Sequence, residues 1–153
     1  MNIKNYTSGV PAEKSINRIE KILMEMGATS INKQINSSKK IEAISFLIIV
    51  NGNTIPFKLP AKASEVYDVL RGEIKRPRKN TLDNLYEQSE RTAWKLVSEW
   101  VEIQMSMIKL KQADFIEVFL PYVYDYNNNK TFYQSIKDGG FKQLPSGQKW
   151  LTK

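Results

Sequence analysis

An uninterrupted amphipathic stretch over residues 82–111 limits the folds open to this chain more than any other feature. No glycine or proline occurs in it, and its apolar residues recur at helical spacing. A helix of that length measures about 45 Å, whereas a domain of this size is about 40 Å across. The helix must therefore span the molecule or project beyond it. Because a projecting apolar stripe needs cover, we predict a homo-oligomer, most simply a homodimer, through this helix. The predicted stripe comprises Leu82, Leu85, Ala93, Leu96, Trp100, Ile103, Met107 and Leu110.

The residues before the long helix predict a helix, a three-stranded antiparallel meander and a second, short helix. Apolar residues at helical spacing, with Pro11 at the start and Gly27 at the end, are typical of a helix. β-branched and alternating residues then indicate strands, and Asn51-Gly52 indicates a two-residue hairpin turn between the last two of them. The predicted ranges are helix 11–26, strands 29–36, 41–50 and 54–59, and helix 64–71.

Two details refine the predicted sheet. Pro56 cannot donate a hydrogen bond, so the third strand is expected at a sheet edge or at a bulge. The run 43–50 is almost continuously apolar, which indicates a central strand covered on both faces, or on one face by a second subunit.

The residues after the long helix form an irregular, aromatic-rich segment with a short predicted helix, 131–137. Asn80 or Thr81 is predicted to cap the long helix at its start. The whole chain, 1–153, is predicted to be a single α+β domain, which agrees with its length of 153 residues and its apolar fraction of 41%.

The absence of histidine and cysteine excludes large classes of chemistry. The chain cannot build an imidazole base, a Ser-His-Asp triad, a thiol nucleophile or a cysteine zinc site. It also contains neither of the common glycine-rich phosphate-loop motifs. We therefore expect no catalytic residues, no metal and no cofactor. The first fourteen residues lack the apolar core of a signal peptide, and no apolar run reaches the ~20 residues that span a bilayer, so we expect a cytoplasmic protein without membrane contact.

The positive charge of the chain, formally +7, is concentrated in one short segment. Residues 71–79 carry five basic residues and one acid, and Pro77 keeps the segment from being helical throughout. Such a patch attracts polyanions and can hold phosphates, although a solubilising connector between helices would have the same composition. The predicted phosphate-binding residues are Arg71, Lys75, Arg76, Arg78 and Lys79.

Three further groups of residues have the composition of a possible site. Asp68, Glu73 and Lys75 resemble the acidic pair and E-x-K of magnesium-dependent nucleases, but those enzymes place E-x-K on a strand, whereas Gly72 and Pro77 bracket it here. On the long helix, Tyr86, Arg91 and Trp94 are expected to be able to form a stacking pocket for a nucleotide. Three alternating tyrosines, Tyr122, Tyr124 and Tyr126, would face one way on an extended segment, as a stacking platform or packed on the sheet.

Several segments resemble a conserved-hypothetical family of small proteins encoded in phages, prophages and bacterial genomes. They are YTSGVPAEKSINRIE (6–20), MGA (26–28), IPFKLPA (55–61), RTAWKLVSEWVEIQM (91–105), VFLPY (118–122) and DGGF (138–141). The resemblance spans nearly the whole chain and implies a phage setting in the host bacterial cytoplasm, but no catalytic residues. That setting favours two hypotheses: a non-catalytic accessory protein that binds nucleic acid, or an inhibitor of host antiviral defence that binds a defence protein or sequesters a nucleotide signal.

Overall fold

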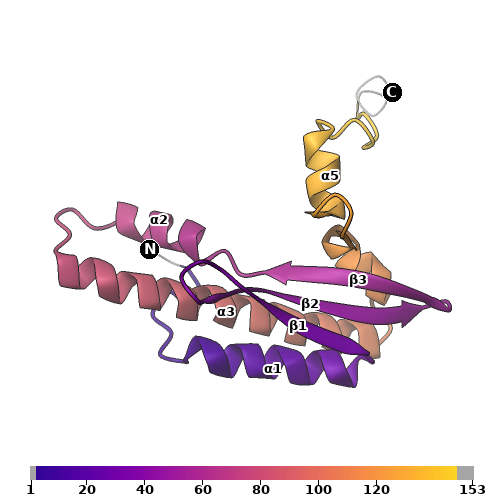
Figure 1. Cartoon of the computed structure of the whole chain (residues 1–153), viewed down its shortest axis with the longest axis horizontal. Helices are drawn as coiled ribbons and strands as arrows, with labels where there is room; N and C mark the ends of the chain where they lie inside the picture. The colour runs from indigo at the N-terminus through magenta and orange to yellow at the C-terminus, as the bar shows by residue number, and fades with distance from the viewer. Residues whose placement is uncertain (1–2, 148–153) are drawn as a thin grey trace.

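A three-stranded antiparallel sheet lies on helices α1 (Ala12–Glu25) and α3 (Lys79–Lys109), and a smaller C-terminal segment projects from the side of this body (Figure 1). The computed structural model describes residues 3–147, so the ends of the predicted domain 1–153 lie outside the described residues. The first six elements confirm the predicted order. They are α1 (Ala12–Glu25), β1 (Ser30–Ile35), β2 (Ile41–Val50), β3 (Asn53–Pro60), α2 (Ala63–Gly72) and α3 (Lys79–Lys109).

The sheet has the order β1-β2-β3, and the hairpin between β2 and β3 forms as predicted. Asn51 and Gly52 both have positive φ, 49° and 79°, which is what a type I′ turn requires. This turn sets Val50 opposite Asn53 and fixes the register of the pair. The strand that contains Pro56 lies at an edge of the sheet, as expected from its missing N–H.

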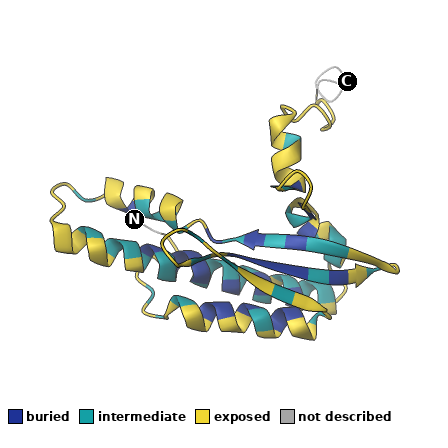
Figure 2. Cartoon of the chain, viewed as in Figure 1, coloured by how far each residue is buried: buried dark blue, intermediate teal, exposed yellow. Residues whose placement is uncertain are grey.

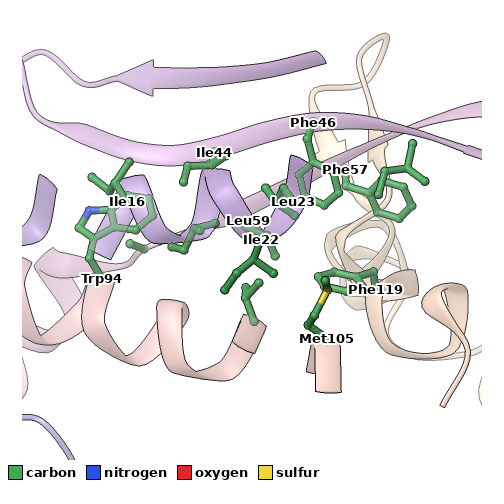
Figure 3. Packing of buried hydrophobic residues seen from close by; sticks show 14 of the residues in the cluster. Ile16, Ile22, Leu23, Ile44, Phe46, Phe57, Leu59, Trp94, Met105 and Phe119 are labelled. Atoms are coloured by element: carbon green, nitrogen blue, oxygen red, sulfur yellow. The ribbon is translucent and has the colours of Figure 1, made fainter. Parts of the chain in front are cut away.

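The core lies between one face of the sheet and helices α1 and α3. Alternate residues of β2 and β3 point toward the helices, and Phe46 stacks on Phe57 with ring centroids 5.2 Å apart. Figure 3 shows Ile16, Leu23 and Trp94 entering the same cluster from α1 and α3. The other face of the sheet is covered in part, since Ala43 and Ser45 on it are 1% and 3% exposed whereas Ile49 is 57% exposed. The expectation of cover on both faces of β2 is therefore met in the first half of the strand and not at its end.

The buried side of α3 differs from the predicted stripe. Trp94 is only 2% exposed, whereas Ile103 and Leu110, both placed in the stripe, are 55% and 71% exposed. The buried residues of α3 include small polar side chains, which an analysis of apolar spacing passes over, and these small side chains let neighbouring helices approach closely. The buried residues are Ser89, Thr92, Ala93, Trp94, Ser98, Val101 and Met105.

The start of α3 also differs from the prediction. The helix begins at Lys79, with Arg78 as its N-cap residue and no side-chain cap hydrogen bond, so neither Asn80 nor Thr81 is the cap. The helix therefore extends into the basic segment. Both α1 and α2 pack against α3, which removes most of the reason to cover this helix with a second subunit.

The C-terminal segment contains more structure than the sequence predicted. The short helix predicted over 131–137 is present, one residue later, and Thr131 and Gln134 form a capping box at its start. This helix stands away from the sheet and is mostly exposed (Figure 2). The elements are α4 (Phe115–Phe119), the 3₁₀ helix η1 (Leu120–Tyr122), β4 (Tyr124–Asp125), β5 (Lys130–Thr131) and α5 (Phe132–Asp138). No helix within residues 3–147 is long and apolar enough to cross a membrane.

Candidate nucleic-acid interface

The five predicted phosphate-binding residues gather at one end of the molecule, where α2 turns into α3 (Figure 1). Arg71 lies in the last turn of α2, Lys75 and Arg76 lie in the connection, and Arg78 and Lys79 begin α3. All five side chains are exposed. Within residues 3–147 none of them forms a side-chain hydrogen bond or an ion pair, so their charges are available to a ligand. We call this group the basic tip: Arg71, Lys75, Arg76, Arg78 and Lys79.

The helix that follows adds to the positive potential of the basic tip. The start of α3 carries the partial positive charge of the helix dipole and presents N–H groups without intrahelical partners. Stability would favour acids there, yet the first turn of α3 has none, and Arg78 and Lys79 occupy the start. Placing cations on a helix N-terminus costs folding free energy, so the arrangement is suited to holding an anion.

The alternative of a metal-dependent nuclease finds no support in the geometry of the described residues. Asp68 lies within α2, Glu73 is the residue that ends it, and Lys75 follows in the connection, so this E-x-K is not on a strand. Residues 3–147 contain no group of three or more carboxylates placed to hold a metal ion.

The stacking pocket predicted from three residues of α3 is not formed. Trp94 is buried in the core, and its Nε1 donates to the Ile41 carbonyl oxygen at 3.3 Å, so its ring has no free face for a base. Arg91 is engaged elsewhere: its Nε donates to the Ser8 carbonyl oxygen at 3.2 Å and its Nη2 to Gln88 Oε1 at 2.6 Å. This prediction failed because helical spacing cannot tell which neighbour fills each face.

Arg91 belongs to a polar clasp that fastens the N-terminal segment to α3. Gln88 Nε2 donates to the Ser8 carbonyl oxygen at 3.0 Å, and Thr92 Oγ1 donates to the Asn5 carbonyl oxygen at 2.9 Å. The clasp holds Tyr6 against α2 and α3, in a groove that sequence reasoning missed. No local signal could have shown it, because Tyr6 and Leu70, which line the groove together, are 64 positions apart in the chain.

Tyr86, the third member of the predicted pocket, lies in a different cavity. This cavity, of about 290 Å³, lies where β2 begins and α2 starts. Tyr86 also contacts the ring of Tyr67, with centroids 5.9 Å apart. Three lysines and three glutamates share the lining with it, so the charges of the cavity largely cancel: Lys40, Lys58, Lys62, Glu42, Glu65 and Glu90.

The three alternating tyrosines do not form one platform. Tyr122 ends η1 and packs edge-on against Trp100, with ring centroids 5.5 Å apart. Tyr124 is buried in β4 with Lys58 over its ring, and Tyr126 lies edge-on to it. The segment is extended over only two residues, so alternate tyrosines do not share one face of a strand.

Comparison with known proteins adds no relative from which a role could be taken. No protein-family model, curated protein or solved structure matches this chain. What the protein binds must therefore be inferred from its own residues, and the basic tip is the most strongly charged feature they form.

Proposed function

We propose that this chain is a phage-type accessory protein that binds nucleic acid through the basic tip and catalyses no reaction. The single observation that carries the proposal is the cluster of five exposed cations at the end of α2 and the start of α3, none of which forms an ion pair within residues 3–147. Arginines fork phosphate oxygens, lysines add point charges, and the N-terminus of α3 contributes oriented N–H groups. The phage setting comes from the resemblance of the sequence alone.

The test compares two variants of equal net charge. In one, the five residues of the basic tip become glutamine. In the other, five exposed lysines outside the tip, none of which forms an ion pair within residues 3–147, become glutamine: Lys14, Lys21, Lys39, Lys111 and Lys142. Both lose five of the excess positive charges. Affinity for a fluorescent oligonucleotide is measured by anisotropy over a range of salt concentrations.

The wild type and the distant variant should bind with a steep salt dependence. Five phosphate contacts give a slope of log K against log salt of about −3.5 for a single strand. The tip variant should lose this slope and nearly all affinity. Equal affinity of the two variants would show that the net charge of the chain, and not the basic tip, attracts the strand. That result would contradict the proposal.

One observation favours a second candidate, an inhibitor of host antiviral defence that sequesters a nucleotide signal. Tyr86 lines the cavity with Lys40, Lys58 and Lys62, a combination that suits a base and a phosphate. The acids in the same lining weaken its attraction for anions, which is why the basic tip is preferred. Mass spectrometry of material released from protein purified from a signalling host would distinguish the two. A small nucleotide released in stoichiometric amount from wild type, and absent from Lys62→Ala, would favour the cavity as the binding site. Polynucleotide that co-purifies with the protein would favour the basic tip.

We also propose that the chain forms a homodimer, but through a surface other than the long helix. Within residues 3–147, four large apolar residues are exposed on the C-terminal arm, defined as α5 and the residues up to 144, whereas on α3 only Ile103 is. We therefore place the homodimer contact on the arm. Its exposed apolar residues are Phe132, Tyr133, Phe141 and Leu144.

A further inference from the structure

An apolar groove runs beside the basic tip, between α2, α3 and the N-terminal segment. It consists of two cavities of about 420 Å³ and 380 Å³ that share Tyr6 and Leu70. The cavity nearer the tip has Ile74 and Leu85 in its walls. Its volume falls within the range of about 300–1,000 Å³ that is usual for sites of small organic groups.

The groove contains an aromatic ring that is free to stack. Tyr6 is 39% exposed, and within residues 3–147 it contacts no other aromatic ring. The clasp through Arg91 and Thr92 holds the backbone on either side of it, at Ser8 and Asn5, so the ring is positioned before any ligand arrives. A held tyrosine over apolar walls suits a planar, weakly polar group such as a nucleobase.

The walls of the groove and the cations of the tip are neighbours in the chain. Leu70 precedes Arg71, and Ile74 precedes Lys75, so each wall residue lies one residue, about 3.8 Å along the backbone, from a tip cation. A strand whose phosphates contact Arg71 and Lys75 therefore has a base within reach of the groove. Glu73 at the rim can accept a hydrogen bond from the amino group of a base.

From this juxtaposition we infer that the groove takes an unpaired nucleobase of the strand bound at the basic tip, stacked on Tyr6. The inference rests on the proposed function and narrows it to single-stranded nucleic acid. A base in a duplex is paired and stacked, so it cannot enter without being extruded at a cost in free energy. Charge complementarity with phosphate is what favours a nucleobase over an apolar peptide or an acyl chain as the occupant.

The experiment measures affinity for three ligands of one length: a single strand, its duplex, and a strand with abasic positions. The proteins are wild type, Tyr6→Leu, and the control Tyr126→Leu, which changes an exposed tyrosine outside both the groove and the proposed dimer contact. Wild type should prefer the single strand by roughly 5- to 150-fold, the range expected for one stacked base. Tyr6→Leu should lose this preference and keep both its duplex affinity and its salt slope, while Tyr126→Leu should behave as wild type.

The outcomes separate the two proposals. Equal affinity for the single, duplex and abasic ligands, with a steep salt slope, would overturn the base site and leave phosphate binding intact. The absence of salt-dependent binding to any strand would overturn both. The abasic strand tests the site even where Tyr6→Leu unfolds. Anionic phosphatidylglycerol vesicles that bind more tightly than any strand, through Tyr6, would assign the groove to acyl chains and also overturn both.

Discussion

At the scale of single residues, Glu90 stands in the least favourable surroundings for its charge. It lies on α3 with its side chain 15% exposed, and its nearest cation is Lys40, whose Nζ is 3.9 Å from Oε2. Its other oxygen, Oε1, is buried without a hydrogen-bond partner. Burial raises the pKa of this carboxyl above its ordinary value near 4.5, and the charge of Glu87 adds to the rise, while Lys40 and Arg91 oppose it.

The raised pKa predicts how stability depends on pH. The folded chain holds the Glu90 proton more tightly than the unfolded chain does, so this residue favours folding most below pH 4.5, and the advantage is lost as pH rises through the folded pKa. Glu90→Gln imitates the protonated form. It should raise the free energy of unfolding by about 1 kcal/mol at pH 7, and the gain should vanish near pH 4.

Chemical denaturation at several pH values checks this prediction. Asp83→Asn, which changes an exposed acid two turns away on the same helix and outside the charges that shift the Glu90 pKa, serves as the control and should leave stability unchanged. A Glu90→Gln variant that is less stable than wild type at pH 7 would mean that the ion pair with Lys40 outweighs the cost of burial.

At the scale of elements, two helices begin at a cation. Within residues 3–147 only α5 has a side-chain cap hydrogen bond, and α2 and α3 have a basic N-cap residue, Lys62 and Arg78. A helix that starts without a favourable N-cap residue, and without another contact that makes up for it, is expected at a functional site. For α3, the proposed reason is the phosphate contact at the basic tip.

Exchanging Arg78 for aspartate should therefore move stability and binding in opposite directions. Aspartate caps a helix N-terminus well and removes a cation from the positive end of the dipole, so Arg78→Asp should gain about 1 kcal/mol in the free energy of unfolding. The same change reverses one charge of the basic tip and should weaken oligonucleotide binding by at least about tenfold in 0.1 M salt. Thermal unfolding and anisotropy measure the two effects.

Lys14→Asp is the matched control, since it makes the same charge reversal in the first turn of α1, outside the basic tip and the groove. It should also stabilise the chain, because an acid is favoured near a helix N-terminus, but leave oligonucleotide affinity within about twofold of wild type. If Arg78→Asp bound as tightly as wild type, the start of α3 would not contact phosphate.

At the scale of the whole molecule, the long helix is covered by its own chain. Its length suggested a projecting stripe, but the N-terminal half packs on α2 and the remainder on α1 and the sheet. Figure 2 shows that the C-terminal arm is exposed over most of its length, and α5 has no buried residue. The exposed apolar residues of the arm are therefore where we place the contact with a second copy.

We expect a homodimer that depends on the arm and not on α3. Leu144 and Ile103 are exposed to nearly the same extent, 56% and 55%, so each can be changed to glutamate without disturbing the core. In sedimentation velocity, Leu144→Glu should be monomeric and Ile103→Glu dimeric. The reverse pattern would return the contact to α3, and a monomeric wild type would remove the homodimer altogether.

The sequence by itself determined the order of elements and the place of the basic tip. Asn51-Gly52 sets a turn through its own φ angles, and a basic run between two helices stays exposed whatever surrounds it. Such features are set by residues adjacent in the sequence, so the sequence alone is enough to predict them.

Tertiary structure alone decided which face of α3 is buried, that Trp94 and Arg91 serve the fold, and that Tyr6 lies beside the basic tip. Each of these depends on contacts between segments far apart in the sequence. Helical spacing shows that a side chain lies on a face, but which face is covered depends on the chain that packs there, because burial removes the surface shared by two elements from water.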